Sequence, residues 1–204
     1  ELPASSGEIG RVINHFRGMA NAIRDNTRNL EAKVHERTLA LERLARHDDL
    51  TGLFNRRGMN ELLHEVQARC QRENQSYGLI WLDLDNFKDI NDNHGHSMGD
   101  QALQAVAEQL RAGIRPYDHA ARWGGDEFLV LLTPCDPSTL TRTAERLREM
   151  IAQASGQQGP MFTVSVGTCL ASADRPLHTV LQAADEALYQ AKQAGRNQYR
   201  VAAD

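Results

Sequence analysis

Residues Tyr77–Asp85 read YGLIWLDLD, and this stretch decides the fold expected for the chain. Its short, nearly unbroken apolar run predicts a buried strand. Two carboxylates, Asp83 and Asp85, close the strand. Because successive side chains of a strand point to opposite faces, these two carboxylates are expected on the same side of it.

Further elements are predicted from the periodicity of the sequence after this strand and just before it. Helices are predicted over residues 56–73, 98–114, 137–154 and 176–194. Strands are predicted over residues 119–123, 127–132, 162–170 and 197–201, with a hairpin around Gly124-Gly125. The element order β-α-β-β-α-β-α-β predicts an α+β fold, in which helices flank a mainly antiparallel sheet of five strands.

The first 46 residues have a different periodicity. Their apolar positions alternate in steps of three and four, which predicts one stripe along a long helix. The stripe consists of Ile9, Val12, Phe16, Met19, Ile23, Leu30, Val34, Leu41 and Leu44, with Thr27 and Arg37 at its two gaps. It is narrow, and no hydrophobic element nearby in the sequence could cover it. This favours a parallel dimeric coiled coil over the alternative, a single amphipathic helix packed on its own domain.

Composition restricts the class of protein. A chain of 204 residues suffices for one domain and an appendage. Its net charge of -4 argues against a nucleic-acid partner. Residues 1–46 have eight basic and six acidic residues (+2), whereas the remaining 15 basic and 21 acidic residues give -6. Cys70, Cys135 and Cys169 form no CxxC pair, which indicates a reducing cytoplasm. The chain opens with Glu1, so we expect a fragment of a longer protein.

Carboxylates also occur in the predicted hairpin. Asp126 and Glu127 follow Gly124-Gly125, which lack a Cβ and let a ligand approach the backbone. With Asp83 they offer the hard oxygen ligands that Mg²⁺ prefers when it also binds substrate phosphates. Such ions neutralise the charge that develops in phosphoryl or nucleotidyl transfer. A DxD strand end or a GGDE turn alone is more often only structural.

Groups that suit a nucleotide lie between and after these carboxylates. Phe87-Lys88 begins a short predicted turn whose N–H groups would point at a phosphate. Asn91 and Asp100 supply an amide and a carboxylate, the groups needed to read a guanine edge. Lys192 and Arg196 lie four residues apart, and we expect both on one face of the last helix, where they could hold a polyphosphate.

A series of motifs resembles, in order and spacing, the GGDEF family of diguanylate cyclases. The signature is RWGGDEF at Arg122–Phe128. The others are HDDLTGLFNRR at His47–Arg57, DLDNFKDINDNHGHSMGD at Asp83–Asp100, TVSVGT at Thr163–Thr168 and ADEALYQAKQAGRNQ at Ala184–Gln198. The resemblance covers nearly all of residues 47–204. It implies a fold similar to the class III nucleotide cyclase and polymerase palm domains.

The resemblance also implies a role for each site residue. The implied ligands of two Mg²⁺ (or Mn²⁺) ions per GTP are Asp83, the main-chain carbonyl of Leu84, Asp126 and Glu127. The implied substrate contacts are the backbone of Asn86 and Phe87, the side chains of Lys88, Lys192 and Arg196, the guanine readers Asn91 and Asp100, and the turn at Gly124 and Gly125. Glu127, Asp126 and Lys88 are the implied catalytic residues.

The activity that the resemblance implies is a nucleotidyl transfer. Two GTP molecules condense to cyclic di-GMP and two pyrophosphates, and each 3′-OH attacks the α-phosphate of the other GTP. Each domain would hold one GTP, so a homodimer is implied. Two alternatives remain: a degenerate module that only binds GTP or cyclic di-GMP, and a purine cyclase making a monomeric product. The complete set of site residues argues against the first, and Asn91 with Asp100 against the second.

A second candidate site is the RxxD sequence at Arg115–Asp118, seven residues before Arg122. At this place it resembles the product-binding inhibitory site of the family. Arginine stacks on purines and binds phosphate or guanine edges in a bidentate manner, and aspartate accepts from guanine. Inhibition would need a second arginine, for which Arg146 is the candidate. The alternative is a salt bridge at a helix end.

The front of the chain resembles a signalling module. SGEIGRVINHFRGM at Ser6–Met19 is similar to the start of the second HAMP helix, and residues 30–52 resemble a HAMP–GGDEF linker. The implied domains are a HAMP remnant with linker over 1–46 and a GGDEF domain over 47–204. Such proteins, including the YfiN/TpbB kind, are usually anchored in the bacterial inner membrane. The resemblance therefore implies a cytoplasmic domain regulated by an upstream periplasmic sensor.

Overall fold

The chain forms two compact units, Glu1–Leu44 and Ala45–Asp204. The computed structural model describes residues 7, 10–21, 24, 28, 30, 31, 33, 45–156, 160–172 and 174–203. In the first unit residues 10–21 are helical, as predicted. Val12, Phe16 and Met19 follow each other at helical spacing and are exposed by 55%, 61% and 46%. The part of the apolar stripe that is described is therefore uncovered within this chain.

Other residues of the predicted stripe lie outside the described part of the chain. They are Ile9, Ile23, Thr27, Val34, Arg37, Leu41 and Leu44. Leu30 is described, is helical, and is 62% exposed. Among the described helices, none is both long enough and apolar enough to cross a membrane.

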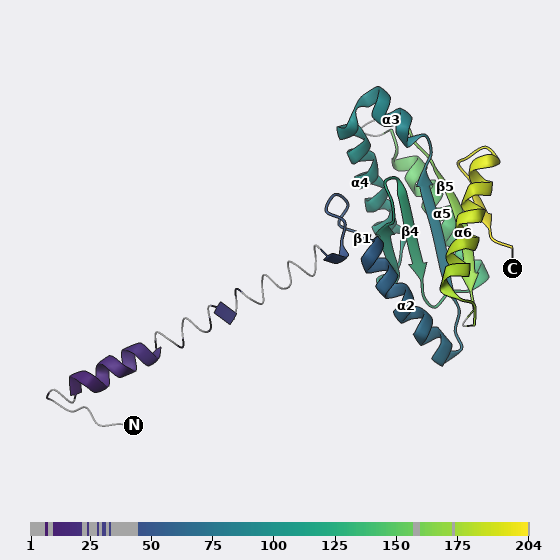
Figure 1. The fold of residues 1–204 in the computed structure, drawn as a ribbon. Helices are drawn as coiled ribbons and strands as arrows, with labels where there is room; N and C mark the ends of the chain where they lie inside the picture. Colours follow the sequence, from purple (N-terminus) through teal and green to yellow (C-terminus); the bar gives the residue numbers. More distant parts are fainter. Residues whose placement is uncertain are drawn as a thin grey trace. The chain divides into compact units, whose positions relative to one another are not determined.

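A sheet of six strands forms the centre of the second unit (Figure 1). The strands are β1 (Phe54–Asn55), β2 (Tyr77–Leu84), β3 (His119–Arg122), β4 (Glu127–Leu132), β5 (Val164–Ala171) and β6 (Tyr199–Val201). They lie in the order β1-β3-β4-β2-β5-β6. The three inner pairs are antiparallel, and the two edge pairs, β1 with β3 and β5 with β6, are parallel. The predicted α+β class with a mainly antiparallel sheet is confirmed, but with six strands instead of five.

The strand that was not predicted is β1, which is too short to be found from the sequence. Two residues cannot display the alternation that identifies a strand. Phe54 and Asn55 become a strand only through pairing with Ala121 and Arg122 of β3. Asn55 then caps the following helix, because its side chain accepts a hydrogen bond from the Gly58 N–H at 2.9 Å.

The described part of this unit has five helices. They are α2 (Arg56–Glu73), α3 (Phe87–His94), α4 (His96–Gly113), α5 (Pro137–Ala154) and α6 (Leu177–Gln193). The four predicted helices are present, but the turn predicted at Phe87-Lys88 is the first turn of helix α3. With eight residues and Ile90 as its only buried member, α3 shows no periodicity that the sequence could reveal. Gly95, at φ +82°, separates α3 from α4.

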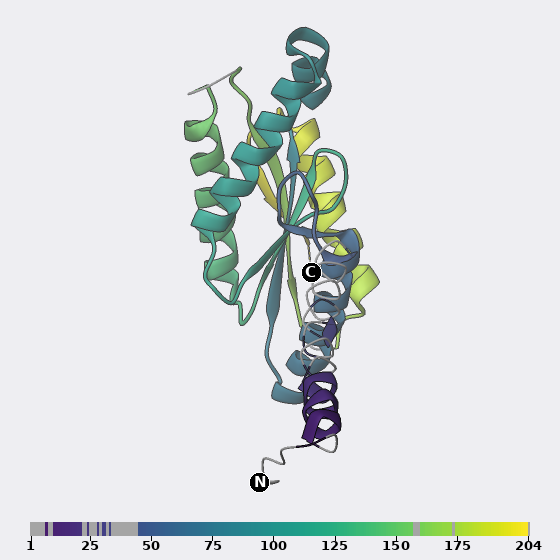
Figure 2. The same ribbon diagram turned by 90° about the vertical axis from the view of Figure 1, so that its left-hand side faces the viewer.

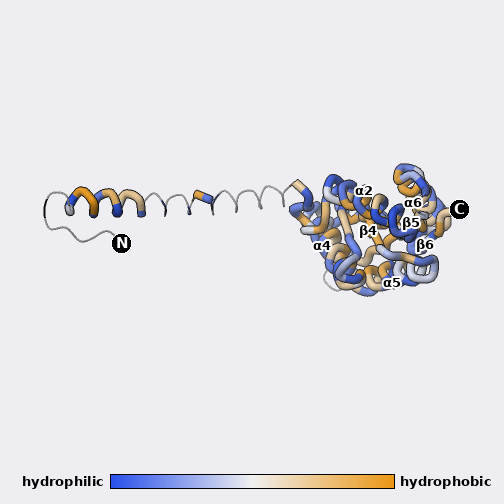
Figure 3. The backbone as a smooth tube through the Cα atoms, turned by 90° about the horizontal axis from the view of Figure 1, so that it is seen from below, coloured by the Kyte–Doolittle hydropathy of each residue, from blue (hydrophilic) through white to orange (hydrophobic). Residues whose placement is uncertain are grey.

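Helices α4 and α5 form a layer on one face of the sheet, and α2 and α6 form a layer on the other (Figure 2). The side chains of Ile80 and Leu82 pack in one core with helices α4 and α5, whereas Leu79 and Trp81 pack in the other with α2 and α6. Along these helices hydrophobic and hydrophilic residues alternate, as Figure 3 shows in orange and blue. All eight residues of β2 are buried, as predicted. Asp83 follows Trp81 by two positions and therefore lies on the same face of the strand, on the side of α2 and α6.

Candidate active site

The acidic groups of the strand and the hairpin meet where β2 and β4 pair. Asp83 lies directly opposite Glu127 in the antiparallel register. The N–H of Leu84 donates to the main-chain carbonyl of Asp126 at 3.2 Å. Like charges at opposite positions of two strands destabilise a sheet. The predicted cluster of carboxylates is thus assembled by strand pairing, at a cost in stability.

Burial and mutual repulsion shift the acidity of this cluster. Burial raises the pKa of Asp83 to about 6, and the charges of Asp126 and Glu127 add to the rise. The pKa of Glu127 is also raised, chiefly by burial and then by Asp126 and Asp185. Both carboxylates are therefore readier to hold a proton than exposed ones.

A cation from α6 partly compensates this charge. Lys192 Nζ lies 2.7 Å from Asp83 Oδ2 and lowers the pKa of Asp83 against the effect of burial. Helix α6 approaches closely enough because it packs on Gly167 of β5. A Cβ at that position would overlap the backbone of Ala184 and Leu188. The glycine of the TVSVGT motif thus brings Lys192 to the carboxylates.

The second carboxylate of the DxD pair, Asp85, is fully engaged elsewhere. It accepts hydrogen bonds from Thr163 Oγ1 at 2.6 Å, Ser165 Oγ at 2.6 Å and the Asn197 N–H at 3.1 Å. Its side chain is buried. With three donors around it, Asp85 has a structural position, and only Asp83 of the pair faces the acidic cluster.

The glycines of the hairpin turn differ in their surroundings. A Cβ on Gly124 would overlap Glu127 Oε2, so the glycine leaves room for that carboxylate. At Gly125 a Cβ would meet nothing within 4 Å. The carbonyl of Gly125 instead accepts hydrogen bonds from Arg122, from Nη2 at 2.7 Å and from Nε at 3.1 Å. Arg122, the last residue of β3, thus closes the turn through its side chain.

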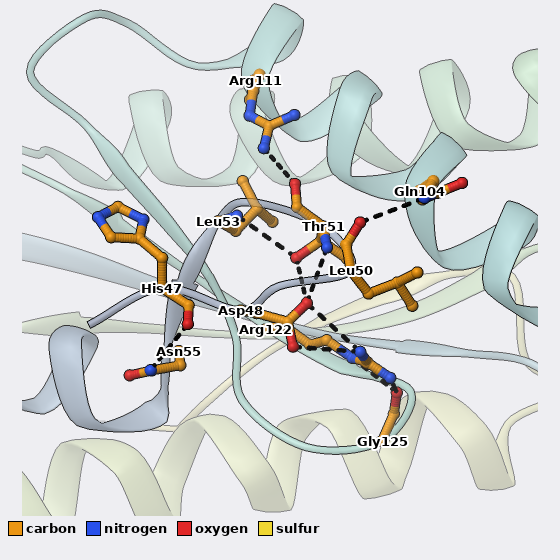
Figure 4. Close-up of polar contacts among 10 residues, drawn as sticks. All are labelled: His47, Asp48, Leu50, Thr51, Leu53, Asn55, Gln104, Arg111, Arg122 and Gly125. Atoms are coloured by element: carbon orange, nitrogen blue, oxygen red, sulfur yellow. Dashed lines mark hydrogen bonds and ion pairs between the residues drawn. The ribbon is translucent and has the colours of Figure 1, made fainter. Parts of the chain in front are cut away.

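An ion pair fastens this turn to the start of the domain (Figure 4). Arg122 Nη1 lies 3.3 Å from Asp48 Oδ2. Asp48 Oδ1 also accepts from the N–H of Thr51 at 2.9 Å and from its hydroxyl at 2.7 Å. Burial would raise the pKa of Asp48, but the hydrogen bonds from Thr51 and the charge of Arg122 outweigh it and lower the pKa. Asp48 is thus held ionised beside Arg122.

The segment with Asp48 is itself fixed at several points (Figure 4). Arg111 donates to the Thr51 carbonyl, and Gln104 donates to the Leu50 carbonyl at 3.3 Å. Asn55 donates to the carbonyl of His47 at 3.0 Å. This role of the HDDLTG segment was not predicted from the sequence. The available signal was the D-x-x-T spacing, which is typical of an aspartate that caps its own turn.

The two groups expected to read a guanine come from adjacent helices. Asn91 lies on α3 with its Oδ1 where a Cβ of Gly99 would be, and Asp100 follows Gly99 on α4. Asp100 is exposed and Asn91 is half-buried. Gly99 therefore allows the amide of Asn91 to lie beside the residue that carries the exposed carboxylate.

The groups expected to bind phosphate have two origins. Asn86 has a left-handed backbone (φ 58°) and precedes α3, so the N–H groups of Phe87 and Lys88 belong to the first turn and have no partner within the helix. Lys88 is exposed. Arg196, however, does not lie on α6 as predicted. The helix ends at Gln193, and Arg196 (φ 63°) lies in the turn that follows Gly195, where its N–H donates to the Ala191 carbonyl at 3.1 Å.

A further arginine near the carboxylates was not predicted. Arg56 Cζ lies 5.0 Å from the ring centroid of Trp123, and its charge lowers the pKa of Glu127. Trp123 in turn packs edge to face on Trp81, with ring centroids 5.6 Å apart. Both tryptophans are buried, as expected of residues that pack in the core. In the sequence, Arg56 stands only in the run NRR at the start of a predicted helix, which carries no signal of its own.

The RxxD sequence forms a tight turn. Asp118 is 8% exposed, and its carboxylate accepts from the N–H of Arg115 at 3.1 Å and from that of Thr133 at 3.3 Å. The side chain of Arg115 is directed at Tyr117, with Cζ 5.8 Å from the ring centroid. A salt bridge between the side chains of Arg115 and Asp118 is absent from the described ion pairs. Asp118 thus shapes the loop, and Arg115 is exposed on it.

Arg146, the proposed second arginine, lies on α5. Leu147, its neighbour in sequence, packs where a Cβ of Gly113 would be. Gly113 ends α4 just before the RxxD loop. The helix with the exposed Arg146 therefore passes close to the loop with Arg115.

The side chains of the site do not by themselves form a complete set of ligands for a divalent metal ion. Within the described residues, no three His, Cys, Asp or Glu side chains converge tightly enough to enclose a metal. Carboxylate oxygens of Asp83, Asp126 and Glu127 and the Leu84 carbonyl still fit Mg²⁺, which binds one or two carboxylates and completes its shell with phosphate and water. Lys192 already pairs with Asp83, which shows that the carboxylate cluster attracts positive charge.

The chain is similar in sequence to proteins of one family. The family described as "Diguanylate cyclase, GGDEF domain" matches residues 45–198. Diguanylate cyclase DgcM of Escherichia coli is 39% identical over 162 residues, covering 79% of this chain and 40% of its own. Diguanylate cyclase DosC of Escherichia coli is 32% identical over 223 residues, covering 97% of this chain and 48% of its own. The chain thus spans less than half the length of these curated relatives.

The chain is also similar in fold to solved structures. The coiled coil and GGDEF domain of DgcB from Caulobacter crescentus, in complex with c-di-GMP, superposes with a TM-score of 0.84. The two are 29% identical, over 90% of this chain and 99% of that one. Family match, relatives and architecture together lead to one conclusion: the chain belongs to the GGDEF family of diguanylate cyclase domains.

Proposed function

We propose that this chain is the catalytic part of a diguanylate cyclase, which condenses two GTP molecules into cyclic di-GMP and two pyrophosphates. The observation that carries the proposal is the juxtaposition of Asp83, Glu127 and Lys192 at the end of β2. Nucleotidyl transfer needs carboxylates that can hold divalent metal ions and a cation that can contact phosphate, and this cluster offers both. The relatives named above are diguanylate cyclases by name, which supports the same reaction here.

Asp83, Asp126, Glu127 and the carbonyl of Leu84 would hold two Mg²⁺ or Mn²⁺ ions per GTP. When bound, these ions neutralise the negative charge of the phosphates. The residues themselves orient the substrate: they fix where the triphosphate lies relative to the GGDEF turn. The Cα side of Gly125 would lie against the nucleotide, since a Cβ there would meet no atom of the described residues within 4 Å.

The remaining substrate contacts follow from the placement of α3, α4 and α6. Asn91 and Asp100 would hydrogen-bond to the guanine edge, while the backbone at Asn86 and Phe87 would bind phosphate. Three cations, Lys88, Lys192 and Arg196, would hold the triphosphate. Lys192 and Arg196 lie at the C-terminal end of α6, and their positive charge also offsets the negative end of the helix dipole there.

The protons of the reaction require a base. Glu127 would face the attacking 3′-OH and accept its proton, with Asp126 beside it and Lys88 at the phosphate. The 3′-oxygen then bonds to the α-phosphorus of the second GTP, and pyrophosphate leaves. Because each domain holds one GTP, the two domains of a homodimer must face each other.

Regulation would come from both ends of the domain. We propose that residues 1–46 are the end of a HAMP domain and its linker helix, and that residues 47–204 form the enzyme. The layout would be that of an inner-membrane cyclase of the YfiN/TpbB kind, with its sensor upstream and this part in the cytoplasm. Arg115, with Asp118 shaping its loop and Arg146 nearby on α5, would bind cyclic di-GMP as a feedback inhibitor.

A second candidate function is a degenerate module that only binds GTP or cyclic di-GMP. The intact cluster of Asp83 and Glu127 with Lys192 disfavours it, because mere binding needs no assembled acidic site. Incubation of the purified chain with GTP and Mg²⁺ or Mn²⁺, followed by chromatography and mass determination, tests both. Cyclic di-GMP is expected. GTP left intact at high protein concentration would support the binding module, and a monomeric cyclic nucleotide would refute both.

A further inference from the structure

The turn that carries Arg196 has an unusual backbone. Gly195, Arg196 and Asn197 have φ angles of 112°, 63° and 46°. A left-handed conformation is open to glycine and tolerated by asparagine, but it is unfavourable for arginine, whose Cβ crowds the backbone there. Such a conformation persists only where the surrounding structure imposes it.

Two contacts impose it at Asn197. Its N–H donates to Asp85 Oδ2 at 3.1 Å, and its side-chain oxygen accepts from Arg148 Nη1 at 2.7 Å. Both partners are themselves fixed. The carboxylate of Asp85 is buried and held by Thr163 and Ser165, as described above.

Arg148 is equally constrained. Its side chain is 16% exposed and makes a two-point ion pair with Glu145, Nε to Oε2 at 2.9 Å and Nη2 to Oε1 at 2.6 Å. This leaves Nη1 for Asn197. We call the set Asp85, Glu145, Arg148 and Asn197 the turn clamp. It connects α5 and the end of β2 to the residue after Arg196.

The backbone of Arg196 is held by its neighbours, but its side chain is not. It is exposed, and among the described residues no hydrogen bond or ion pair from its guanidinium occurs. The backbone is thus fixed from two sides while the charge is left available. This is the arrangement expected where the position of a charged group matters to a ligand.

We propose that Arg148 and Asp85 are positioning residues for Arg196: through Asn197 they hold the left-handed turn that places its guanidinium at the triphosphate of GTP. The proposal rests on the proposed function, since it takes Arg196 as a phosphate contact. Arg148 lies on α5, whereas the proposed contacts to substrate come from α3, α4, α6 and the hairpin. It would therefore act only through the turn.

A binding experiment without turnover tests this role. We would measure the affinity of the full chain for 3′-deoxy-GTP with Mg²⁺ by calorimetry, because this analogue lacks the attacking hydroxyl. Arg196→Ala should weaken binding about tenfold, as expected for loss of a charged hydrogen bond. Arg148→Ala should weaken it roughly threefold, and only by loosening the turn. Arg142→Ala, which removes an exposed arginine from the same helix, should leave the affinity unchanged.

The double variant separates positioning from general loosening of the fold. If Arg148 acts through Arg196, then Arg148→Ala should have no further effect on affinity in the Arg196→Ala background. An equal loss in both backgrounds would overturn the proposal. Should Arg148→Ala fail to fold, Asn197→Ala removes the same hydrogen bond while leaving the pair of Arg148 and Glu145 intact, and the same outcomes apply.

The outcomes also distinguish this proposal from the proposed function. Normal affinity of Arg196→Ala would remove Arg196 from the phosphate site and with it the basis of the clamp's role. Weakened binding in Arg196→Ala with wild-type binding in both Arg148→Ala and Asn197→Ala would overturn the clamp alone and leave the cyclase assignment standing.

Discussion

At the scale of single residues, Asp83 shows how the site is built at the expense of stability. It is 6% exposed, lies opposite Glu127 in the sheet, and has one cation, Lys192, at 2.7 Å. Burial and the neighbouring carboxylates raise its pKa to about 6. The ionised carboxylate is therefore unfavourable in the folded protein without a ligand.

We predict that Asp83→Asn abolishes product formation and stabilises the fold at neutral pH. The pKa of Asp83 is higher in the folded than in the unfolded chain, so its ionisation favours unfolding. The cost is absent below about pH 4, grows between about pH 4 and 6, and is fully present above that range. Asp83→Asn should thus raise the free energy of unfolding at pH 7.5 by about 1–3 kcal/mol.

Thermal unfolding at a series of pH values measures this effect. The gain of the variant over the unchanged chain should disappear as the pH falls from about 6 to 4. Asp89→Asn, at an exposed position of α3, serves as the control and should show no such dependence. A variant that is equally or less stable across the whole range would contradict the assignment of strain to Asp83.

A second prediction at this scale concerns the RxxD loop. Asp118 accepts two main-chain N–H groups, whereas the guanidinium of Arg115 has no such structural hydrogen bond among the described residues. Arg115→Ala should therefore abolish cyclic di-GMP binding, measured by calorimetry, without changing the melting temperature or GTP affinity. Asp118→Ala, by contrast, should also lower the melting temperature, because two main-chain N–H groups lose the carboxylate that accepts their hydrogen bonds. Undiminished product binding in Arg115→Ala would place the inhibitory site elsewhere.

At the scale of elements, the hairpin between β3 and β4 depends on a partner outside it. Arg122 closes the turn on the Gly125 carbonyl and pairs with Asp48, which belongs to the segment that leads into β1 and α2 (Figure 4). The pair is mostly shielded from water, with side-chain exposures of 18% and 22%. It is thus worth more than a surface ion pair.

We expect Arg122→Ala to lower kcat more than it raises KM, because the turn with Asp126 and Glu127 is no longer held in place. The free energy of unfolding should fall by about 1–3 kcal/mol, as for a half-buried charge that loses its partner. Steady-state kinetics and denaturant titration measure the two effects. Glu61→Ala is the matched control: its pairs with Arg46 and Arg57 are more exposed and should contribute less than about 1 kcal/mol. The double variant Arg122→Ala/Asp48→Ala tests the pair itself. If its loss of unfolding free energy equals the sum of the two single losses, the two side chains are not coupled.

At the scale of the whole molecule, the proposed reaction needs two domains. Each offers one set of carboxylates, and the described part of the first unit has exposed apolar residues, Val12, Phe16 and Met19. Thr27 and Arg37 interrupt the same stripe at two positions. A coiled coil with such interruptions holds together only at high concentration.

We therefore predict that the specific activity of this chain rises with protein concentration. Replacing residues 1–46 with a parallel leucine zipper in the heptad phase of Leu41 and Leu44 should raise it further. The same zipper shifted by two residues is the control for phase. Light scattering measures the oligomeric state at each dilution, and constant specific activity in a monomeric species would contradict the dimer mechanism.

The sequence determined much of this protein by itself. The apolar run of β2, the periods of α2, α4, α5 and α6, and the GGDEF hairpin are local patterns, and local patterns fix element type. Two carboxylates that adjoin such patterns, Asp83 and Glu127, could be placed at strand ends from the sequence alone. Family membership followed from motifs with the same local character.

Only the tertiary structure decided how these patterns combine. β1 exists because β3 pairs with it, and α3 was too short to show a period. Asp83 and Asp85 look alike in the sequence, yet Thr163, Ser165 and Asn197 occupy Asp85 from distant parts of the chain. The end of the last helix at Gly195 is a local signal, but the left-handed turn at Arg196 beyond it is held by contacts from Asp85 and Arg148 to Asn197. The pairing of β1, the engagement of Asp85 and the turn at Arg196 arise from contacts between residues far apart in sequence, which no local pattern encodes.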